Sequence, residues 1–218
     1  MTDIILHVSF FVALFLFIIT LVFQVTMYNY KQGRKYSFRN ELPFELVQGV
    51  DNRFLHYHYI LIFVVTLAQV LFAFNYLEAL VHWYEFLLVG SVTLSAITFY
   101  LLFFIRVFEV KKHILVVILQ ALSVVTSFLA FGFLLHFNIR GNQNLPFAIV
   151  CYVIAFLALV SLLNSKLRRW PIMDKVVQQD GSILILRPRY FLLAIYEWAF
   201  IVLQFVQLTL MYIYLFIR

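Results

Sequence analysis

The chain has 218 residues, of which 65% are hydrophobic, 19% aromatic and only 12% charged. An ordinary soluble domain is about half apolar and about one quarter charged, so this chain has too little polar surface to cover a water-soluble globule. A single cysteine excludes a disulfide framework and a four-cysteine zinc site. The formal net charge is +6, and its placement along the chain decides between a nucleic-acid partner and a membrane.

A membrane-spanning helix needs about 20 mostly apolar residues, because nothing in the hydrocarbon satisfies an open backbone group. Six stretches of the sequence meet this requirement, and their predicted bounds are 4–28, 55–77, 86–106, 113–136, 145–164 and 190–217. The first stretch is too long for a cleavable signal peptide and lacks a basic leader. We therefore predict an all-α integral membrane protein, in which residues 1–218 form a single six-helix bundle with two short structured cytoplasmic loops.

The basic residues follow the order of the spans. Fourteen of the sixteen lie in alternate connections, after the first, third and fifth spans. The positive-inside rule then predicts that these three connections are cytoplasmic and that both termini lie outside. The same residues suit anionic lipid headgroups, so we expect the lipid bilayer as a partner and no nucleic acid. The compact loops favour a bacterial plasma membrane as the location.

The two longer basic loops, 31–53 and 166–189, carry local structural signals. In the first, Asn40 is placed to cap a short helix over 41–48 that Gly49 ends, with its apolar face in the membrane interface. In the second, apolar residues flank Asp180-Gly181 within 176–185, a pattern typical of a β-hairpin.

Polar residues in and after the first loop form a candidate site on the cytoplasmic side. Its members are Glu41, Glu45, Asp51, Arg53, His56 and His58. The cluster of Asp51 and Arg53 beside His56 fits either headgroup chemistry or a helix cap and anchor, and a cap is the commoner role at a span boundary. His56 and His58 diverge by about 200° on a helix, so they cannot share one metal ion there.

Glu197 is the one carboxylate inside a predicted span, and an ionisable group in a membrane helix is a candidate for function. Gln204 and Gln207 follow at seven and ten residues, near the same helix face, so the three can line a pathway or bind a ligand. The alternative is that Glu197 lies near the cytoplasmic interface and pairs with Arg187 or Arg189. We favour the interfacial pair, because the residues after Glu197 are alone long enough to cross the bilayer.

Small residues mark three of the spans as helix-packing surfaces, because they let backbones approach closely in lipid. They are Gly90, Ser91 and Ser95 in the third span, Ser123 and Ser127 in the fourth, and Ala148, Cys151, Ala155 and Ala158 in the fifth. We expect these three spans to form the tight centre of the bundle, with the lining of a ligand cavity as the alternative. Cys151 has no neighbouring base or cysteine and is expected to be an inert packing residue.

His113 and His136 stand at opposite ends of the fourth span, which is the arrangement that a two-haem membrane cytochrome needs. Histidines at span ends are more often interfacial, so we predict no metal site and no cofactor, with haem as the alternative.

One segment resembles a known family. Pro43-Phe44-Glu45 stands in a basic loop after the first span, and over residues 10–110 the chain is similar to the small A-type membrane subunit of respiratory complex I. That family carries an acidic pair in its second span, where this chain has no acidic residue and carries Thr66, Gln69 and Asn75 instead, and three further spans follow here. We therefore assign no family and transfer no site.

The sequence contains no serine-hydrolase elbow, zinc-protease motif, Walker loop or dinucleotide fingerprint. Its spans are nearly free of charge and are rarely interrupted by Gly or Pro, which weighs against ion-coupled pumps and broken-helix transporters. We expect a non-enzymatic accessory or assembly subunit of a larger membrane complex, with other membrane-protein subunits as partners. A transporter or substrate-binding subunit for small solutes or lipids is the first alternative, and a lipid-active membrane enzyme is the second.

Overall fold

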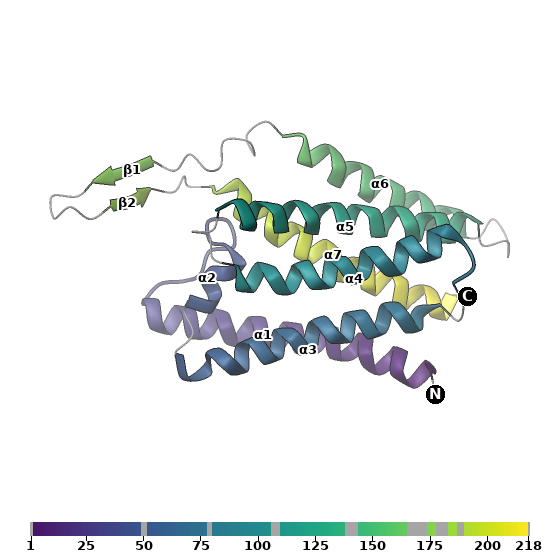
Figure 1. Cartoon of the computed structure of the whole chain (residues 1–218), viewed down its shortest axis with the longest axis horizontal. Helices are drawn as coiled ribbons and strands as arrows, with labels where there is room; N and C mark the ends of the chain where they lie inside the picture. Colours follow the sequence, from purple (N-terminus) through teal and green to yellow (C-terminus); the bar gives the residue numbers. More distant parts are fainter. Residues whose placement is uncertain are drawn as a thin grey trace.

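The computed structural model describes residues 2–48, 52–77, 80–105, 110–137, 144–164, 174–177, 183–186 and 190–217. Within these ranges the chain forms seven helices and two strands (Figure 1). In chain order they are α1 (Thr2–Gln32), α2 (Pro43–Gln48), α3 (Asn52–Tyr76), α4 (Trp83–Phe104), α5 (Val110–Phe137), α6 (Leu145–Leu162), β1 (Asp174–Val177), β2 (Ile183–Leu186) and α7 (Leu192–Ile217).

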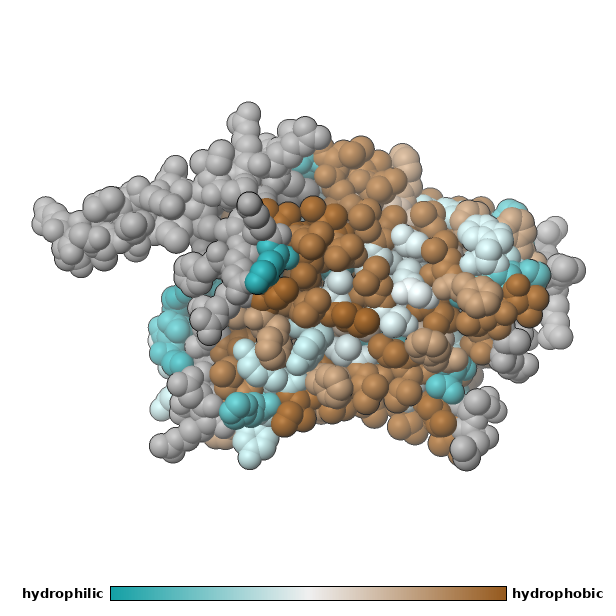
Figure 2. Space-filling model, in the orientation of Figure 1, coloured by the Kyte–Doolittle hydropathy of each residue, from teal (hydrophilic) through white to brown (hydrophobic). Residues whose placement is uncertain are grey.

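Six of these helices, all except α2, are long and apolar enough to cross a membrane. Each of them overlaps one predicted span, so the prediction of a six-helix membrane bundle is confirmed. Figure 2 shows apolar side chains over most of the middle of the face that it presents, as expected for a surface solvated by lipid tails. The protein is a multi-pass helical membrane protein.

The helices alternate in direction, so the chain has two distinct ends. The described parts of α1, α4 and α6 end where α3, α5 and α7 begin, and α2 lies at this same end. The three basic connections therefore share one end of the bundle, which we call the basic end. Both chain termini lie at the opposite end (Figure 1).

Packing joins neighbouring helices in the order of the chain. The closest pairs are α4 with α5, α1 with α3, α5 with α6, and α3 with α4, while α7 lies against α5, α4, α1 and α2. The centre is filled by fully buried aromatic side chains, among them Phe72, Phe99, Phe103, Phe128 and Phe131. Such large rings supply much of the dispersion attraction that holds helices together in lipid.

The expectation that the third, fourth and fifth spans form the centre is wrong for the fifth. Only 22% of the α6 span is buried, against 56% for α4 and for α5. The small residues of α6 are its buried ones, namely Ala148, Cys151, Ala155 and Ala158. They cover a single face, which packs on α5, and the other faces of α6 point outward.

Gly90 also needs correction as a packing residue. It is exposed, and a β-carbon placed there would meet no atom within 4 Å. The four candidate serines, Ser91, Ser95, Ser123 and Ser127, are buried, and each donates its hydroxyl to the carbonyl three residues earlier in its own helix. Their hydroxyls are therefore satisfied locally, and the side chains serve close packing.

Both structured loops are present. β1 and β2 pair antiparallel with Val177 opposite Ile183, which confirms the two predicted strands, and Figure 1 draws them beyond the basic end. The predicted turn at Asp180-Gly181 lies outside the described residues. The short helix begins at Pro43, and Glu45 Oε2 accepts a hydrogen bond from the Leu42 backbone N–H at 2.7 Å. The N-terminus of this helix is therefore capped by Leu42 and Glu45 in place of Asn40. Because Leu42 and Leu46 are fully buried, α2 packs into the bundle and does not lie in the membrane interface.

Candidate functional site

A row of buried polar side chains crosses the middle of the bundle. The Thr98 hydroxyl of α4 donates to Gln120 Oε1 of α5, and Gln120 Nε2 donates to Gln204 Oε1 of α7 at 2.5 Å. Gln204 Nε2 in turn donates to Gln69 Oε1 of α3. We call these four residues the amide chain, since each is at most 2% exposed and together they connect four helices.

The amide chain explains how three glutamines are tolerated inside apolar spans. A buried amide without partners costs several kcal/mol in a medium that offers no water, on the order of 2–7 kcal/mol. Bonds between helices remove most of that cost, and each is worth about 0.6 kcal/mol on average in membrane proteins. Gln69 Nε2 is the terminal group, and it has no partner among the residues that the structure describes.

Gln207 lies one turn beyond Gln204 but is held less firmly. Its Nε2 reaches the Ser127 carbonyl of α5 at 3.4 Å, and its Oε1 has no partner in the described part of the chain. The structure therefore separates the three residues that the sequence placed on one face of the last span. Gln204 belongs to the amide chain, and Gln207 makes one long contact. Glu197, seven residues before Gln204, contacts neither of them and pairs with His113.

Glu197 is buried against His113 near the basic end. Glu197 Oε1 lies 2.9 Å from His113 Nε2, and both side chains are inaccessible to solvent. The other ring nitrogen, His113 Nδ1, lies 3.2 Å from the carbonyl oxygen of Ile105, the residue that follows α4. The sequence favoured Arg187 or Arg189 as the partner of Glu197, and both arginines lie outside the described residues.

The segment from Gly33 to Gln48, which we call the cap, covers the basic end next to this pair. Trp198, the neighbour of Glu197, donates its indole N–H to the Glu41 carbonyl at 3.0 Å and to the Tyr36 hydroxyl at 3.2 Å. The Phe191 backbone N–H donates to the Arg39 carbonyl at 3.0 Å. The cap is therefore tied to the beginning of α7 through both backbone and side-chain bonds.

The Glu41 carboxylate is the internal anchor of the cap. It accepts hydrogen bonds from the Tyr28 hydroxyl and, at 2.7 Å, from the Ser37 backbone N–H, and it forms an ion pair with Arg34 at 2.5 Å. Burial lowers the pKa of Arg34, but the hydrogen bond to Glu41 and the negative charge of that carboxylate, with smaller contributions from Tyr28 and Glu45, together raise it, so the guanidinium stays charged. Burial also raises the pKa of Tyr36 well above its usual range, so its hydroxyl remains a neutral donor to the backbone of the cap.

The remaining candidates of the first loop do not converge. Glu45 caps α2, His58 is buried and accepts a hydrogen bond from Gln24 Nε2 at 2.6 Å, and His56 is exposed on the same helix. The two histidines thus point to different surroundings, as the helical spacing predicts. Asp51 and the Arg53 side chain lie outside the described residues.

The histidines considered for haem also lie in different surroundings. His113 uses both ring nitrogens for contacts within the protein, whereas His136 is exposed at the other end of α5. A haem ligand at His113 would have to give up its contact with Glu197 or with Ile105.

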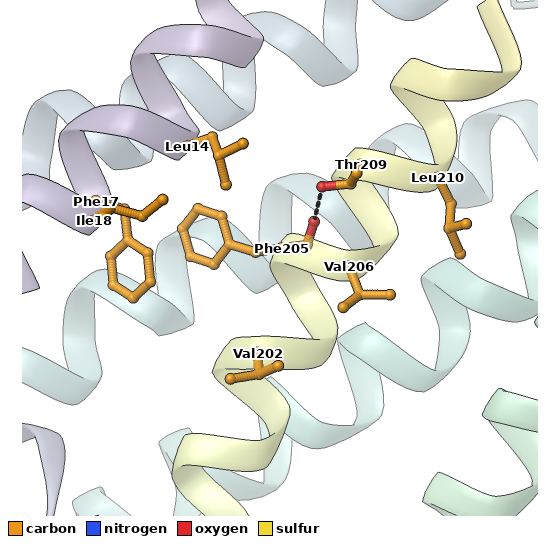
Figure 3. Close-up of a pocket in the computed structure, with 8 residues that line it drawn as sticks. All are labelled: Leu14, Phe17, Ile18, Val202, Phe205, Val206, Thr209 and Leu210. Carbon is orange, nitrogen blue, oxygen red and sulfur yellow. Dashed lines mark hydrogen bonds between the residues drawn. The ribbon is translucent and has the colours of Figure 1, made fainter.

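An apolar groove of about 350 Å³ lies between α1 and α7 (Figure 3). Its lining residues are Leu14, Phe17, Ile18, Val202, Phe205, Val206, Thr209 and Leu210. The rings of Phe17 and Phe205 stack at 4.2 Å between centroids, and the Thr209 hydroxyl donates to the Phe205 carbonyl at 2.8 Å. The groove thus presents an apolar lining in the middle of two spans.

Sequence reasoning did not single out Gln24, Gln69 or Gln120 as site residues, and it assigned His113 to a possible haem. The available signal was the presence of amide side chains in the interior of apolar spans, where each needs a partner from another helix. The fold and these contacts define a six-span helical membrane protein whose interior polar groups bond to one another. No protein-family model, no curated protein and no solved structure matches the chain.

Proposed function

We propose that this chain is a non-enzymatic accessory or assembly subunit of a larger membrane complex. The amide chain carries the proposal, because it uses the central polar side chains as bonds between helices, which makes the bundle a rigid unit. A rigid bundle of this kind acts through its outer surface.

The surface that best suits a partner subunit is the outward side of α6. This helix rests on α5 alone over most of its length, and its span is only 22% buried. Large side chains stand on its outward side, with Phe156 64% exposed and Leu157 60% exposed. Helices associate in lipid through close van der Waals packing, so a second subunit that covers these side chains would bury the most weakly packed span.

Purification from native membranes in a mild detergent tests this proposal. The double variant Phe156→Ala with Leu157→Ala truncates the outward side of α6, and the variant Phe63→Ala with Leu67→Ala is its matched control on α3, where these side chains are 52% and 45% exposed. We expect wild type and control to elute with the same partner and the α6 variant to elute alone. Equal retention of the partner by all three, or a monomeric wild type, would contradict the proposal.

The location that we propose is a bacterial plasma membrane with the basic end in the cytoplasm and both termini outside. Thiol labelling in intact cells tests the orientation after Cys151 is replaced by alanine. A cysteine at Tyr30, which is 88% exposed at the basic end, should resist a membrane-impermeant reagent, whereas one at Val81, 72% exposed at the other end, should react. The reverse pattern would invert the topology.

One observation favours a transporter or substrate-binding subunit as the second candidate. Glu197 and His113 are ionisable and buried inside the spans, and such residues often mark substrate or ion pathways. Under this alternative, Glu197→Gln abolishes uptake or binding of a small solute while the partner still co-purifies. Under the accessory proposal, wild type itself shows no uptake or binding of a small solute, and Glu197→Gln changes only the stability of the protein.

A further inference from the structure

The contacts of His113 fix how many protons the pair with Glu197 must hold. The Ile105 carbonyl oxygen can only accept a hydrogen bond, so the proton in that 3.2 Å contact is on His113 Nδ1. His113 Nε2 then faces Glu197 Oε1 at 2.9 Å, a distance at which two lone pairs would repel. A second proton therefore lies between these two atoms.

We propose that His113 and Glu197 form a buried proton-binding site that holds one shared proton between the imidazole ring and the carboxyl group. The ligand is the proton itself. Whether the proton is on His113 Nε2 or on Glu197 Oε1, the pair is neutral as a unit. Loss of the proton would leave a carboxylate beside a neutral ring, and both side chains are inaccessible to solvent, so that charge would be buried without compensation.

The second carboxyl oxygen supports the same assignment. Glu197 Oε2 is buried and has no hydrogen-bond partner among the described residues. An ionised carboxylate in a dry site needs donors on both oxygens to offset its desolvation, and within the described part of the chain only one oxygen has a donor. The shared proton makes the pair neutral, so the Glu197 carboxyl group does not need a hydrogen-bond donor at Oε2.

Other charges around the pair also favour holding a proton. Ile105 follows the last turn of α4, so its carbonyl belongs to the negative end of that helix dipole. Glu45 of α2 adds a further negative charge that acts on both His113 and Glu197. Among the cations of the described residues at this end, Arg34 is paired with Glu41 and Lys112 is exposed.

The site lies close to one side of the membrane. His113 and Glu197 stand in the first two turns of α5 and α7, at the basic end. The cap covers this end, and Trp198, the residue that follows Glu197 in sequence, donates its indole N–H to the Glu41 carbonyl of the cap. The site therefore stands at the basic end of the bundle, beneath the cap.

The proton count gives a direct test through the pH dependence of unfolding. Between pH 7.5 and 9 an unfolded chain has neutral histidine and ionised glutamate, so unfolding of this site releases one proton. One released proton raises the unfolding equilibrium constant tenfold for each pH unit. In Glu197→Gln the amide N–H donates to His113 Nε2, so the contact persists with no extra proton.

The experiment measures reversible unfolding of the purified full chain in detergent or bicelles across this pH range. We expect the logarithm of the wild-type unfolding constant to rise by about one unit more per pH unit than that of Glu197→Gln. Glu85→Gln is the matched control, because it removes a carboxylate that caps α4 at the other end of the bundle, and its slope should equal that of wild type. Equal slopes for wild type and Glu197→Gln would overturn the proposal.

A second readout needs no variant. Nitrogen-15 NMR of the histidine-labelled wild type at pH 8 should show one of the six histidines with protons on both ring nitrogens, or infrared spectra should show a protonated carboxyl band. Six neutral rings together with no protonated carboxyl band would overturn the proposal. The inference is independent of the accessory role, since it concerns the interior pair and not the outer surface of α6.

Discussion

Replacement of Gln204 by leucine should cost more stability than any other single change at the buried glutamines of α7. Gln204 donates to Gln69 and accepts from Gln120, so leucine removes two bonds between helices and leaves a partner group unpaired on each neighbour. Interhelical bonds in membranes average about 0.6 kcal/mol, with a maximum of about 1.7 kcal/mol. With two bonds lost, the free energy of unfolding should fall by about 1–3 kcal/mol, and every 1.4 kcal/mol changes the equilibrium tenfold.

Gln207→Leu is the matched control on the same helix. Gln207 is as deeply buried as Gln204, but it makes one contact, at 3.4 Å, so the same substitution should cost at most about 0.5 kcal/mol. Both variants are compared with wild type by steric trapping or by reversible denaturation in bicelles. A Gln207→Leu variant that is destabilised as much as Gln204→Leu would refute the view that the amide chain holds the bundle together.

Two further pairs of substitutions test the packing and the cap. A β-carbon at Gly132 would fall 2.5 Å from a ring carbon of Tyr152 on α6, so Gly132→Ala should lower the free energy of unfolding by about 1–3 kcal/mol. A β-carbon at Gly90 would meet nothing within 4 Å, so Gly90→Ala should change the free energy of unfolding by less than about 0.5 kcal/mol. Equal thermal shifts for the two variants would disprove the close α5–α6 contact. Tyr28→Phe removes a bond to the buried Glu41 carboxylate and should cost about 1–2 kcal/mol and speed proteolysis of the cap, while Tyr30→Phe, 88% exposed, should do neither.

The spans could be predicted closely because the cost of exposing backbone to lipid leaves only helices of sufficient length. The predicted span 145–164 and the helix Leu145–Leu162 nearly coincide. The helix α1 extends to Gln32, beyond the predicted end at residue 28, since hydrogen bonding along the helix continues into the interface where water and headgroups solvate its last residues. Apolar composition therefore finds the buried part of a helix and not its full length.

Partners between helices could not be predicted in the same way. The sequence shows that Glu197 needs compensation, but the choice between His113 and a loop arginine depends on which helices become neighbours. The same holds for α6, whose small residues indicate a packing face but not that α5 is the helix that covers most of it. Composition sets the need for a contact, and the three-dimensional arrangement decides which residue supplies it.

The proposed role as a subunit is tested most directly by photo-crosslinking in the native host membrane. A photoreactive amino acid is placed at Phe156 on the outward side of α6, and at Phe63 on α3 as the matched lipid-facing control. The proposal predicts one discrete protein adduct from position 156 and only lipid adducts from position 63. Lipid adducts alone at both positions would contradict it.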